Sequence, residues 1–443
     1  MIELIDNIQE NLSRQEIADF LPFANRRIAD LCKGNSHLLP FPNCLSLSED
    51  GIGDSPIFTF EPNGDDYVNV KAGNILGFIG INGKRMKIRS RFDESGKDYF
   101  LNYMLQRVLA YHIINLPYSY SSDNSLNLLV LLFPVYLREA LQQGAYREYR
   151  RFMRNDANIR GTIDVPRHLR YNTPFQGNVA YSVRDHTPDN MIMHLIRHTI
   201  EYLKSQKLGA AILNADKDII MDVQQVYRLT ETYKKSERQM VIRHNLRPFR
   251  HPYYTRYLPL QQLCLQILRN ESMMYASGRN ELSGILIDGS WLWEEYVAKL
   301  LPQFNHPHNR KQRGGLPLFS DRNYPQYPDF YNHDIVLDAK YKRLENTIGR
   351  EDIHQLVTYM YMMQTKYGGY IYPYSSKEIY DLPYSPSSKY GTLMGYGGIV
   401  YRYGIEICSH AKDYPSFCNE MKMAELVFQQ ELIKHLAQSN ETI

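Results

Sequence analysis

The stretch YPDFYNHDIVLDAKYK, residues 327–342, decides the fold of the C-terminal part of this chain. Its centre, residues 335–337, is an uninterrupted apolar run, which is typical of a strand buried on both faces of a sheet. Side chains alternate between the faces of a strand, so Asp338 and Lys340 are predicted to project to the same side. Asp329 supplies a second carboxylate. Because Mg²⁺ prefers hard oxygen ligands, these carboxylates predict a magnesium site, with Mn²⁺ as the alternative metal. The lysine would orient or help deprotonate the attacking water and stabilise charge on a phosphate.

Helices are predicted on either side of this strand. The segment GSWLWEEYVAKLL, residues 289–301, has apolar side chains at helical spacing and carries Glu294 and Glu295. We assign Glu294 to the metal site, with Glu295 as the alternative because the helix phase is open. In the later segment EDIHQLVTYMYMM, Gln355 and Tyr359 are four residues apart and therefore lie on one helix face. On its own, an Asp-x-Lys pair at a strand end is also a common salt bridge at the rim of a sheet.

The succession of a helical Glu, an Asp, Asp-x-Lys and a Gln-x-x-x-Tyr helix resembles the PD-(D/E)xK nuclease superfamily, in its subgroup with a Gln-x-x-x-Tyr helix. Segments upstream of this core narrow the resemblance to the McrC family, the nuclease subunit of modification-dependent (type IV, McrBC-like) restriction systems. These segments are ILGFIGINGKRMKIRSRFD at residues 75–93, LLFPVYLREALQQGAYREYRR at 131–151, NIRGTIDVPRHLRYN at 158–172 and VRDHTPDN at 183–190. The resemblance runs from about residue 65 to about residue 375.

The resemblance implies a Mg²⁺-dependent DNA endonuclease that works with an McrB-like AAA+ GTPase hexamer carrying the methylated-DNA recognition module. This chain would dock into that ring through its N-terminal half, stimulate GTP hydrolysis, and cut double-stranded DNA when translocation is blocked. The catalytic residues would be Glu294, Asp329, Asp338, Lys340, Gln355 and Tyr359, with Asp329, Asp338 and Glu294 as metal ligands. The sequence contains no G-x-x-x-x-G-K-[ST] phosphate loop, so we expect no nucleotide on this chain alone.

Two other functions fit the same residues. One is a stand-alone PD-(D/E)xK nuclease without a motor. The other is a non-catalytic scaffold of a defence complex that has kept the fold. A double-strand break needs two active sites, so pairing with a second copy of the chain is also consistent with the nuclease reading.

The expected fold class is mixed, α+β. Residues 1–250 would form a partner-binding region of β-strands followed by helices, and residues 251–443 the α/β endonuclease core with a C-terminal extension. Strands are predicted over residues 66–92, with Asn82-Gly83 as a hairpin turn. Helices are predicted over residues 12–32, 98–115, 126–154, 189–206, 216–236, 259–278 and 419–437.

Two groups of basic residues are candidates for partner or DNA contact. The first group falls on one face of a strand and comprises Arg85, Lys87, Arg89 and Arg91. The second follows helical spacing as a single stripe and comprises Arg147, Arg150, Arg151 and Arg154. The alternative interpretations are an edge strand protected by charge and a solvated helix face.

Composition bounds the remaining possibilities. The 443 residues allow two or three domains with full cores, and the net charge of +3 does not by itself indicate a nucleic-acid binder. The five cysteines form no CxxC pair, which argues against a zinc ribbon or a disulfide framework. The N-terminus does not resemble a secretory signal and no apolar run has the length of a membrane span, so we expect a cytoplasmic protein without membrane contact.

Overall fold

The computed structural model of the protein describes residues 1–35, 37–42, 52–109, 125–269, 282–307, 315–321, 323–344, 347–375, 387–395 and 397–440. These residues divide into two compact units. Unit 1 comprises residues 1–131 and 272–443, and unit 2 comprises residues 132–271. The predicted boundary at residue 250 therefore coincides with neither end of unit 2. In the described residues no helix is both long enough and apolar enough to cross a membrane.

The first part of unit 1 contains a sheet in the order β1-β7-β6-β11-β3 and a smaller antiparallel sheet in the order β2-β5-β4. The strands are β1 (Ile2–Ile5), β2 (Gln9–Ser13), β3 (His37–Phe41), β4 (Phe58–Asn63), β5 (Tyr67–Ala72), β6 (Ile75–Ile81), β7 (Lys84–Arg89) and β11 (Ser283–Asp288). The helices are α1 (Arg14–Ile17), α2 (Ile28–Gly34) and α3 (Tyr99–Val108), with short 3₁₀ turns η1 (Leu21–Phe23) and η2 (Ile52–Asp54). An apolar core of aliphatic and phenylalanine side chains joins the two sheets.

One strand of this sheet, β11, is distant in sequence from the other strands, because it follows unit 2 in the chain. It pairs antiparallel with β6 and parallel with β3. Glycines permit this close approach: Gly77 and Gly284 both have positive φ, and a Cβ on either would lie about 2 Å from a carbonyl oxygen of the facing strand. Because β11 leads directly into the helix that carries Glu294, the N-terminal sheet and the predicted nuclease core are parts of one unit.

The second part of unit 1 is a mixed sheet in the order β14-β15-β16-β18-β17, in which β15, β16 and β18 are parallel. The strands are β14 (Phe330–Tyr331), β15 (Ile335–Ala339), β16 (Tyr367–Ser375), β17 (Ser388–Thr392) and β18 (Ile399–Ile407), with a separate short ribbon of β12 (Leu316–Pro317) and β13 (Pro325–Gln326). The helices are α11 (Gly289–Leu300), α12 (Arg350–Met363) and α13 (Tyr414–Asn440). The parallel pair β15 and β16 is connected through α12, as expected for a βαβ crossover.

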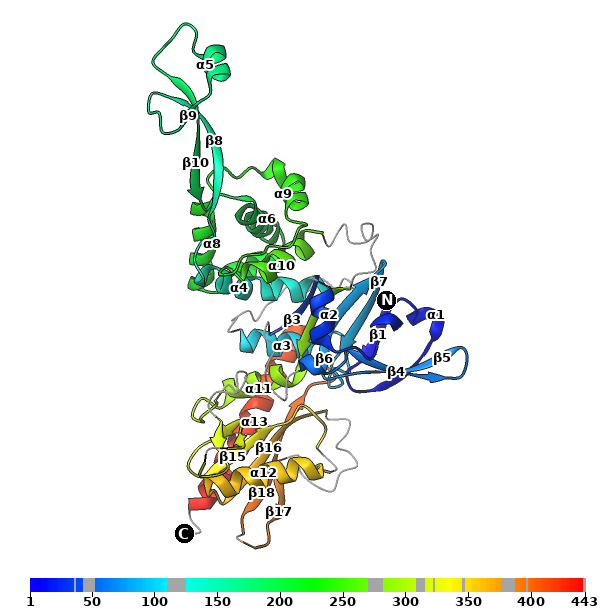
Figure 1. Ribbon diagram of the computed structural model, residues 1–443. Helices are drawn as coiled ribbons and strands as arrows, with labels where there is room; N and C mark the ends of the chain where they lie inside the picture. The colour runs from blue at the N-terminus through cyan, green and yellow to red at the C-terminus, as the bar shows by residue number, and fades with distance from the viewer. Residues whose placement is uncertain are drawn as a thin grey trace. The chain divides into compact units, whose positions relative to one another are not determined.

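Helices cover both faces of this sheet (Figure 1). Val336 and Tyr370 face α12 and share a core with Leu356. The alternate side chains point to the other face, where Tyr403 meets Phe428 of α13 with ring centroids 6.3 Å apart. This two-faced burial explains why β15 reads as a continuous apolar run, and the strand predicted over residues 335–337 is confirmed.

Unit 2 combines helices with an antiparallel ribbon in the order β8-β10-β9. Its strands are β8 (Glu148–Asp156), β9 (Thr162–Ile163) and β10 (Val179–Thr187). Its helices are α5 (Val165–Tyr171), α6 (Met191–Ser205), α7 (Lys207–Leu213), α8 (Lys217–Leu229), α9 (Arg238–His244) and α10 (Tyr257–Arg269), with the 3₁₀ turn η3 (Lys235–Glu237); α4 (Ser125–Gln142) spans the boundary with unit 1. Within this unit the ribbon runs out from the helices and carries α5 at its far end (Figure 1).

Several predicted elements are confirmed and two are wrong. The predicted hairpin turn is present, with positive φ at both Asn82 and Gly83. The helix predicted over residues 12–32 is instead β2, the short helices α1 and α2 and the turn between them. The helix predicted over residues 126–154 ends at Gln142, and β8 follows it. Residues 110–115 and 270–278, the ends of two other predicted helices, lie outside the described residues.

Candidate active site

Asp338 and Lys340 lie at the carboxyl end of β15 and project to the same face, as the alternation of strand side chains predicted. The Lys340 Nζ atom is 2.8 Å from Asp338 Oδ2. Asp338 is almost completely buried, with 2% of its side chain exposed, whereas Lys340 keeps 20%. Lys340 N donates to Ile371 O of β16 at 2.9 Å, so the backbone of the pair is held in the sheet.

A chain of hydrogen bonds connects this pair to α12. Lys340 Nζ donates to Gln355 Oε1 at 2.8 Å, and Gln355 Nε2 donates to the Tyr359 hydroxyl at 2.7 Å. Tyr359 in turn donates to the carbonyl oxygen of Tyr327 at 3.2 Å. The predicted neighbourhood of Gln355 and Tyr359 on one face of a helix is therefore confirmed, and this face points to the ammonium group of Lys340.

Asp329 reaches the same strand end from the segment before β14. Its Oδ2 atom accepts a hydrogen bond from Ala339 N at 2.7 Å. The carboxylate therefore lies against the backbone between Asp338 and Lys340. This contact brings together the two parts of the sequence motif, which are separated by nine positions in the chain.

The helix α11 presents Glu294, and not Glu295, toward Asp329. Glu294 Oε1 is 3.8 Å from His306 Nε2, and His306 Nδ1 is 2.8 Å from the carbonyl oxygen of Asp329. Glu295 instead accepts a hydrogen bond from the indole nitrogen of Trp291, one turn earlier, at 3.2 Å. Of the two glutamates, these contacts bring Glu294 nearer to Asp329 through His306.

The electrostatics of the pair favour a charged lysine. Burial acts to lower the pKa of Lys340, but the carboxylates of Asp338 and Asp329 outweigh it and hold the pKa above its ordinary value. Burial raises the pKa of Asp338, and the nearby Lys340 opposes that rise. A lysine held in its ammonium form can donate hydrogen bonds and stabilise negative charge, but it is a poor proton acceptor.

The oxygen donors suit a hard divalent cation, although they are not gathered as a complete set. Asp329 and Asp338 both reach the end of β15, and a cation would stabilise the buried carboxylate of Asp338. Among the described residues, however, no three His, Cys, Asp or Glu side chains lie close enough together to hold a metal ion. Two carboxylates are sufficient for Mg²⁺, because this ion usually keeps several of its waters.

Three further groups at this site were not assigned from sequence. Asp352 on the first turn of α12 lies 2.5 Å from Lys342 Nζ and 3.8 Å from Lys340 Nζ. The His306 ring stacks on Phe330 with centroids 4.7 Å apart. The carbonyl of Tyr327 completes the hydrogen-bond chain. The HPH tripeptide was the available signal for His306, whereas nothing in the linear pattern distinguished Asp352 from the adjacent Glu351.

The basic residues of β7 share one strand face, as predicted, but they are paired inside unit 1. Lys87 Nζ lies 2.5 Å from Asp98 Oδ2, and Arg89 Nε lies 3.9 Å from Glu3. Arg91, beyond the strand end, has only 7% of its side chain exposed and is not available as the contact residue we expected. Arg85 is half-buried.

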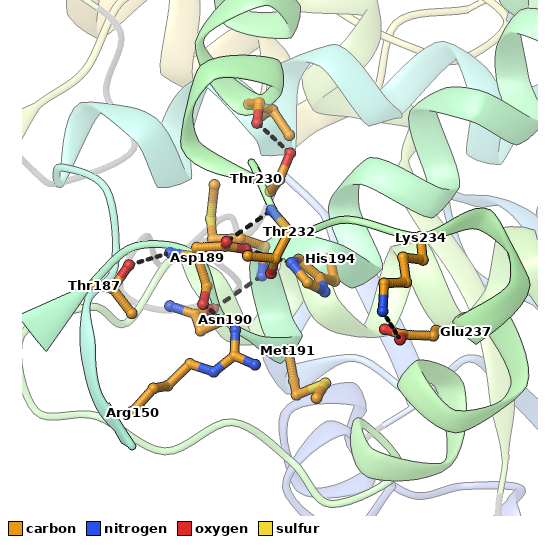
Figure 2. A network of polar contacts seen from close by, with 12 residues as sticks. Arg150, Thr187, Asp189, Asn190, Met191, His194, Thr230, Thr232, Lys234 and Glu237 are labelled. Atoms are coloured by element: carbon orange, nitrogen blue, oxygen red, sulfur yellow. Dashed lines mark hydrogen bonds and ion pairs between the residues drawn. The ribbon is translucent and has the colours of Figure 1, made fainter. Parts of the chain in front are cut away.

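The predicted arginine stripe on a helix is wrong, because residues 148–156 form β8. On a strand, Arg150 and Arg154 share one face and Arg151 lies on the other. Arg150 donates to the carbonyl of Asp189, in a network where Asp189 also receives the Thr232 N–H and contacts His194 (Figure 2). Arg151 donates to Ser182 Oγ at 2.9 Å, and Arg154 lies 3.5 Å from Asp185. These three arginines connect β8 to β10 and to Asp189, which follows β10. Arg147, just before β8, is exposed.

A protein-family model described as "McrBC 5-methylcytosine restriction system component" matches residues 70–373. The chain belongs to the McrBC family. The match begins within β5 and runs beyond the candidate site at β15, so the McrBC family relationship extends over all of unit 2 and over β14, β15 and most of β16.

More distant similarities connect this McrBC family member to solved structures from Thermococcus gammatolerans. One is a refined half-complex from a tetradecameric assembly of McrB AAA+ hexamers with bound McrC; it has 16% identity and a TM-score of 0.47, and the match covers 95% of this chain and 99% of that chain. The other is the cryo-EM structure of the McrBC complex, with 16% identity, a TM-score of 0.31 and coverage of 68% and 87%. Neither similarity is close enough to place a residue of the site. A search of the curated proteins finds no match.

Proposed function

We propose that this chain is the DNA endonuclease subunit of an McrBC-type restriction system and that its active site is at the end of β15. The observation that carries the proposal is the contact of Lys340 with both Asp338 and Gln355, with Asp329 against the intervening backbone. Family membership supports the restriction role, and this geometry supports phosphodiester hydrolysis.

In the proposed mechanism Asp338, Asp329 and Glu294 would hold Mg²⁺, which would supply Lewis-acid stabilisation of the phosphate. Lys340 donates hydrogen bonds that orient the attacking water and stabilises charge that develops on the phosphate. Gln355 restrains the ammonium group, because its Oε1 accepts from Lys340 while its Nε2 is engaged by Tyr359. The raised pKa of Lys340 favours this orienting role over proton abstraction.

We propose that the partner is an McrB-type AAA+ GTPase and that the far end of the unit 2 ribbon docks on it. Large apolar side chains are exposed around α5, which is uncommon on a surface without a partner. They include Ile163, Val165, Leu169, Tyr171 and Phe175, each between 47% and 64% exposed. Arg147 remains a candidate contact, but the residue that would stimulate GTP hydrolysis is not assigned.

The test is a cleavage assay of the purified chain on methylated and unmethylated double-stranded DNA, with and without the cognate GTPase, GTP and Mg²⁺. We expect cleavage of methylated DNA only when all components are present. Asp338→Ala should reduce cleavage by about 100-fold or more, because it removes a metal ligand and the partner of Lys340. The same variant should still bind the GTPase, since the docking surface is separate.

The other outcomes decide between functions. Metal-dependent cleavage by the chain alone would indicate a stand-alone nuclease. No cleavage under any condition, together with no Mg²⁺ or Mn²⁺ binding in calorimetry, would indicate a scaffold. Undiminished metal-dependent cleavage by Asp338→Ala would contradict the assigned site.

A further inference from the structure

An open pocket of about 670 Å³ lies at the surface of unit 2, and none of the residues assigned to DNA cleavage lines it. It is formed where the segment before β8 meets the start of α6, α9 and the loop after α9. Its volume is within the range of about 300–1,000 Å³ that is usual for small-molecule sites. The proposed function gives no role to this cavity.

The charged groups at the cavity favour an anion. Arg243 and Arg247 both line it as exposed side chains, and among the described residues neither guanidinium has a hydrogen-bond or ion-pair partner. His244 adds a third basic side chain, whereas Glu148 is the acidic side chain among the lining residues. Two arginines without partners are well suited to a phosphate or carboxylate, because the planar guanidinium binds such groups through paired hydrogen bonds.

The walls of the cavity favour a ligand with a planar apolar body. The Tyr146 and Phe249 rings line it, with centroids 4.8 Å apart in an edge-on arrangement, and Met191 and Met240 supply flexible thioether side chains. Further aromatic contacts hold these rings, because Tyr146 packs edge-on against Tyr254 with centroids 5.4 Å apart and Phe249 stacks on His251 with centroids 6.3 Å apart. Aromatic faces and methionines bind flat unsaturated rings without strict hydrogen-bond requirements.

A carboxylate side chain from a partner protein could pair with the two arginines, but it would leave most of the apolar volume empty. We therefore propose that this cavity binds a phosphorylated ligand of the nucleotide class, with its phosphate at Arg243 and Arg247 and its base against Tyr146 and Phe249. Such binding needs no phosphate loop, since side chains supply the donors that the loop's backbone otherwise provides.

The experiment is isothermal titration calorimetry of the purified full-length chain, without its GTPase, using guanosine monophosphate as the probe. Inorganic phosphate and guanosine are titrated separately. We expect the monophosphate to bind. Inorganic phosphate and guanosine should each bind at least about tenfold more weakly, because each engages only part of the pocket. Saturation by phosphate alone with equal affinity would overturn the assignment of a base site.

Variants locate the binding. The double variant Arg243→Gln with Arg247→Gln should weaken binding of the monophosphate by about 10- to 100-fold, because charge-assisted hydrogen bonds are lost. Met240→Trp should block binding by filling the cavity, and it is expected to fold because Met240 is 48% exposed. The matched controls are Arg228→Gln and Met221→Trp on α8, exposed positions outside the lining, and these should bind like the parent chain.

Three results would overturn the proposal. These are no heat of binding at millimolar monophosphate, binding that survives both Met240→Trp and the double arginine variant, and equal loss in the α8 controls. If the parent chain binds no monophosphate but the double arginine variant loses stimulation of the GTPase, the cavity is a protein-docking surface instead.

Discussion

At the scale of single residues, the orientation of α11 distinguishes two adjacent glutamates. Glu294→Gln should lower DNA cleavage by about 10- to 100-fold, as expected when a metal ligand is neutralised. Glu295→Gln should leave the rate within a factor of about three, because Glu295 is engaged by Trp291 on its own helix. The measurement is the single-turnover cleavage rate of the complete system at saturating Mg²⁺. The reverse order of effects would show that α11 presents its other face to the metal.

Gln355 is predicted to restrain Lys340 through its hydrogen bond of 2.8 Å. Gln355→Ala should reduce the cleavage rate by about tenfold, since the hydrogen bond to the charged ammonium group accounts for about 1.5–3 kcal/mol. His354→Ala, at the preceding exposed position, is the matched control and should cleave normally. Because Lys340 also contacts Asp338, the Gln355 variant should retain more activity than Asp338→Ala; equal loss would mean that Gln355 contacts the reacting groups itself.

At the scale of elements, the buried cation Arg91, just after β7, is expected to contribute more to stability than the charged residues of β7 itself. Arg91 Nη2 donates to the Tyr341 carbonyl at 2.6 Å and to Asn74 at 2.9 Å, and it lies 3.4 Å from the fully buried Asp6. Burial raises the pKa of Asp6 to about 6, and Arg91 opposes this shift. Since Tyr341 follows Lys340, this cluster connects the N-terminal sheet to the strand that carries the candidate active site.

We expect Arg91→Ala to reduce the free energy of unfolding of unit 1 by about 3–5 kcal/mol, because it leaves Asp6 buried without its cation. Lys84→Ala, at the start of β7, is the control. Its ion pair with Asp19, at 2.7 Å, is open to solvent, so its loss should reduce the stability much less than the loss of Arg91 does. Chemical denaturation of both variants at neutral pH measures the difference. Equal effects would show that the buried pair contributes no more than the surface pair.

At the scale of the whole molecule, the two compact units have separate cores and should respond separately to acid. His198 in unit 2 is buried, which lowers its pKa to about 4, and Tyr233 is hydrogen-bonded to it at 2.9 Å. Between pH 6.5 and pH 4 the unfolded chain binds a proton at this histidine and the folded chain does not. The free energy of unfolding of unit 2 therefore falls as pH falls through this window.

His198→Phe should remove this contribution, so that the stability of unit 2 changes less between pH 6.5 and pH 4 than in the parent chain. Hydrogen exchange of peptides from residues 132–271, compared with peptides from the rest of the chain, measures this difference. Peptides of unit 1 should show the same pH dependence in both proteins. An unchanged pH dependence in unit 2 would mean that His198 is protonated in the folded state.

The local pattern around β15 was predictable from the spacing of apolar residues. A strand buried on both faces gives a continuous apolar run, and the helices beside it repeat apolar residues every three or four positions. Asp338, Lys340, Gln355 and Tyr359 were found in this way. The arginines of β8 could not be placed, because spacings of three and four residues also occur by chance on a strand. Only the pairing with β10 distinguished the two structures.

The sequence by itself therefore determined the family-specific motif, the strand that carries it and the helix face opposite, since these depend on neighbours in the chain. The tertiary structure decided that Glu294 contacts His306 beside Asp329, and it decided which arginines are exposed. It also decided that β11 joins the N-terminal sheet, which places both ends of the chain in one unit. These features depend on contacts between residues that are tens to hundreds of positions apart, and hydrophobic periodicity carries no information about such distant pairs.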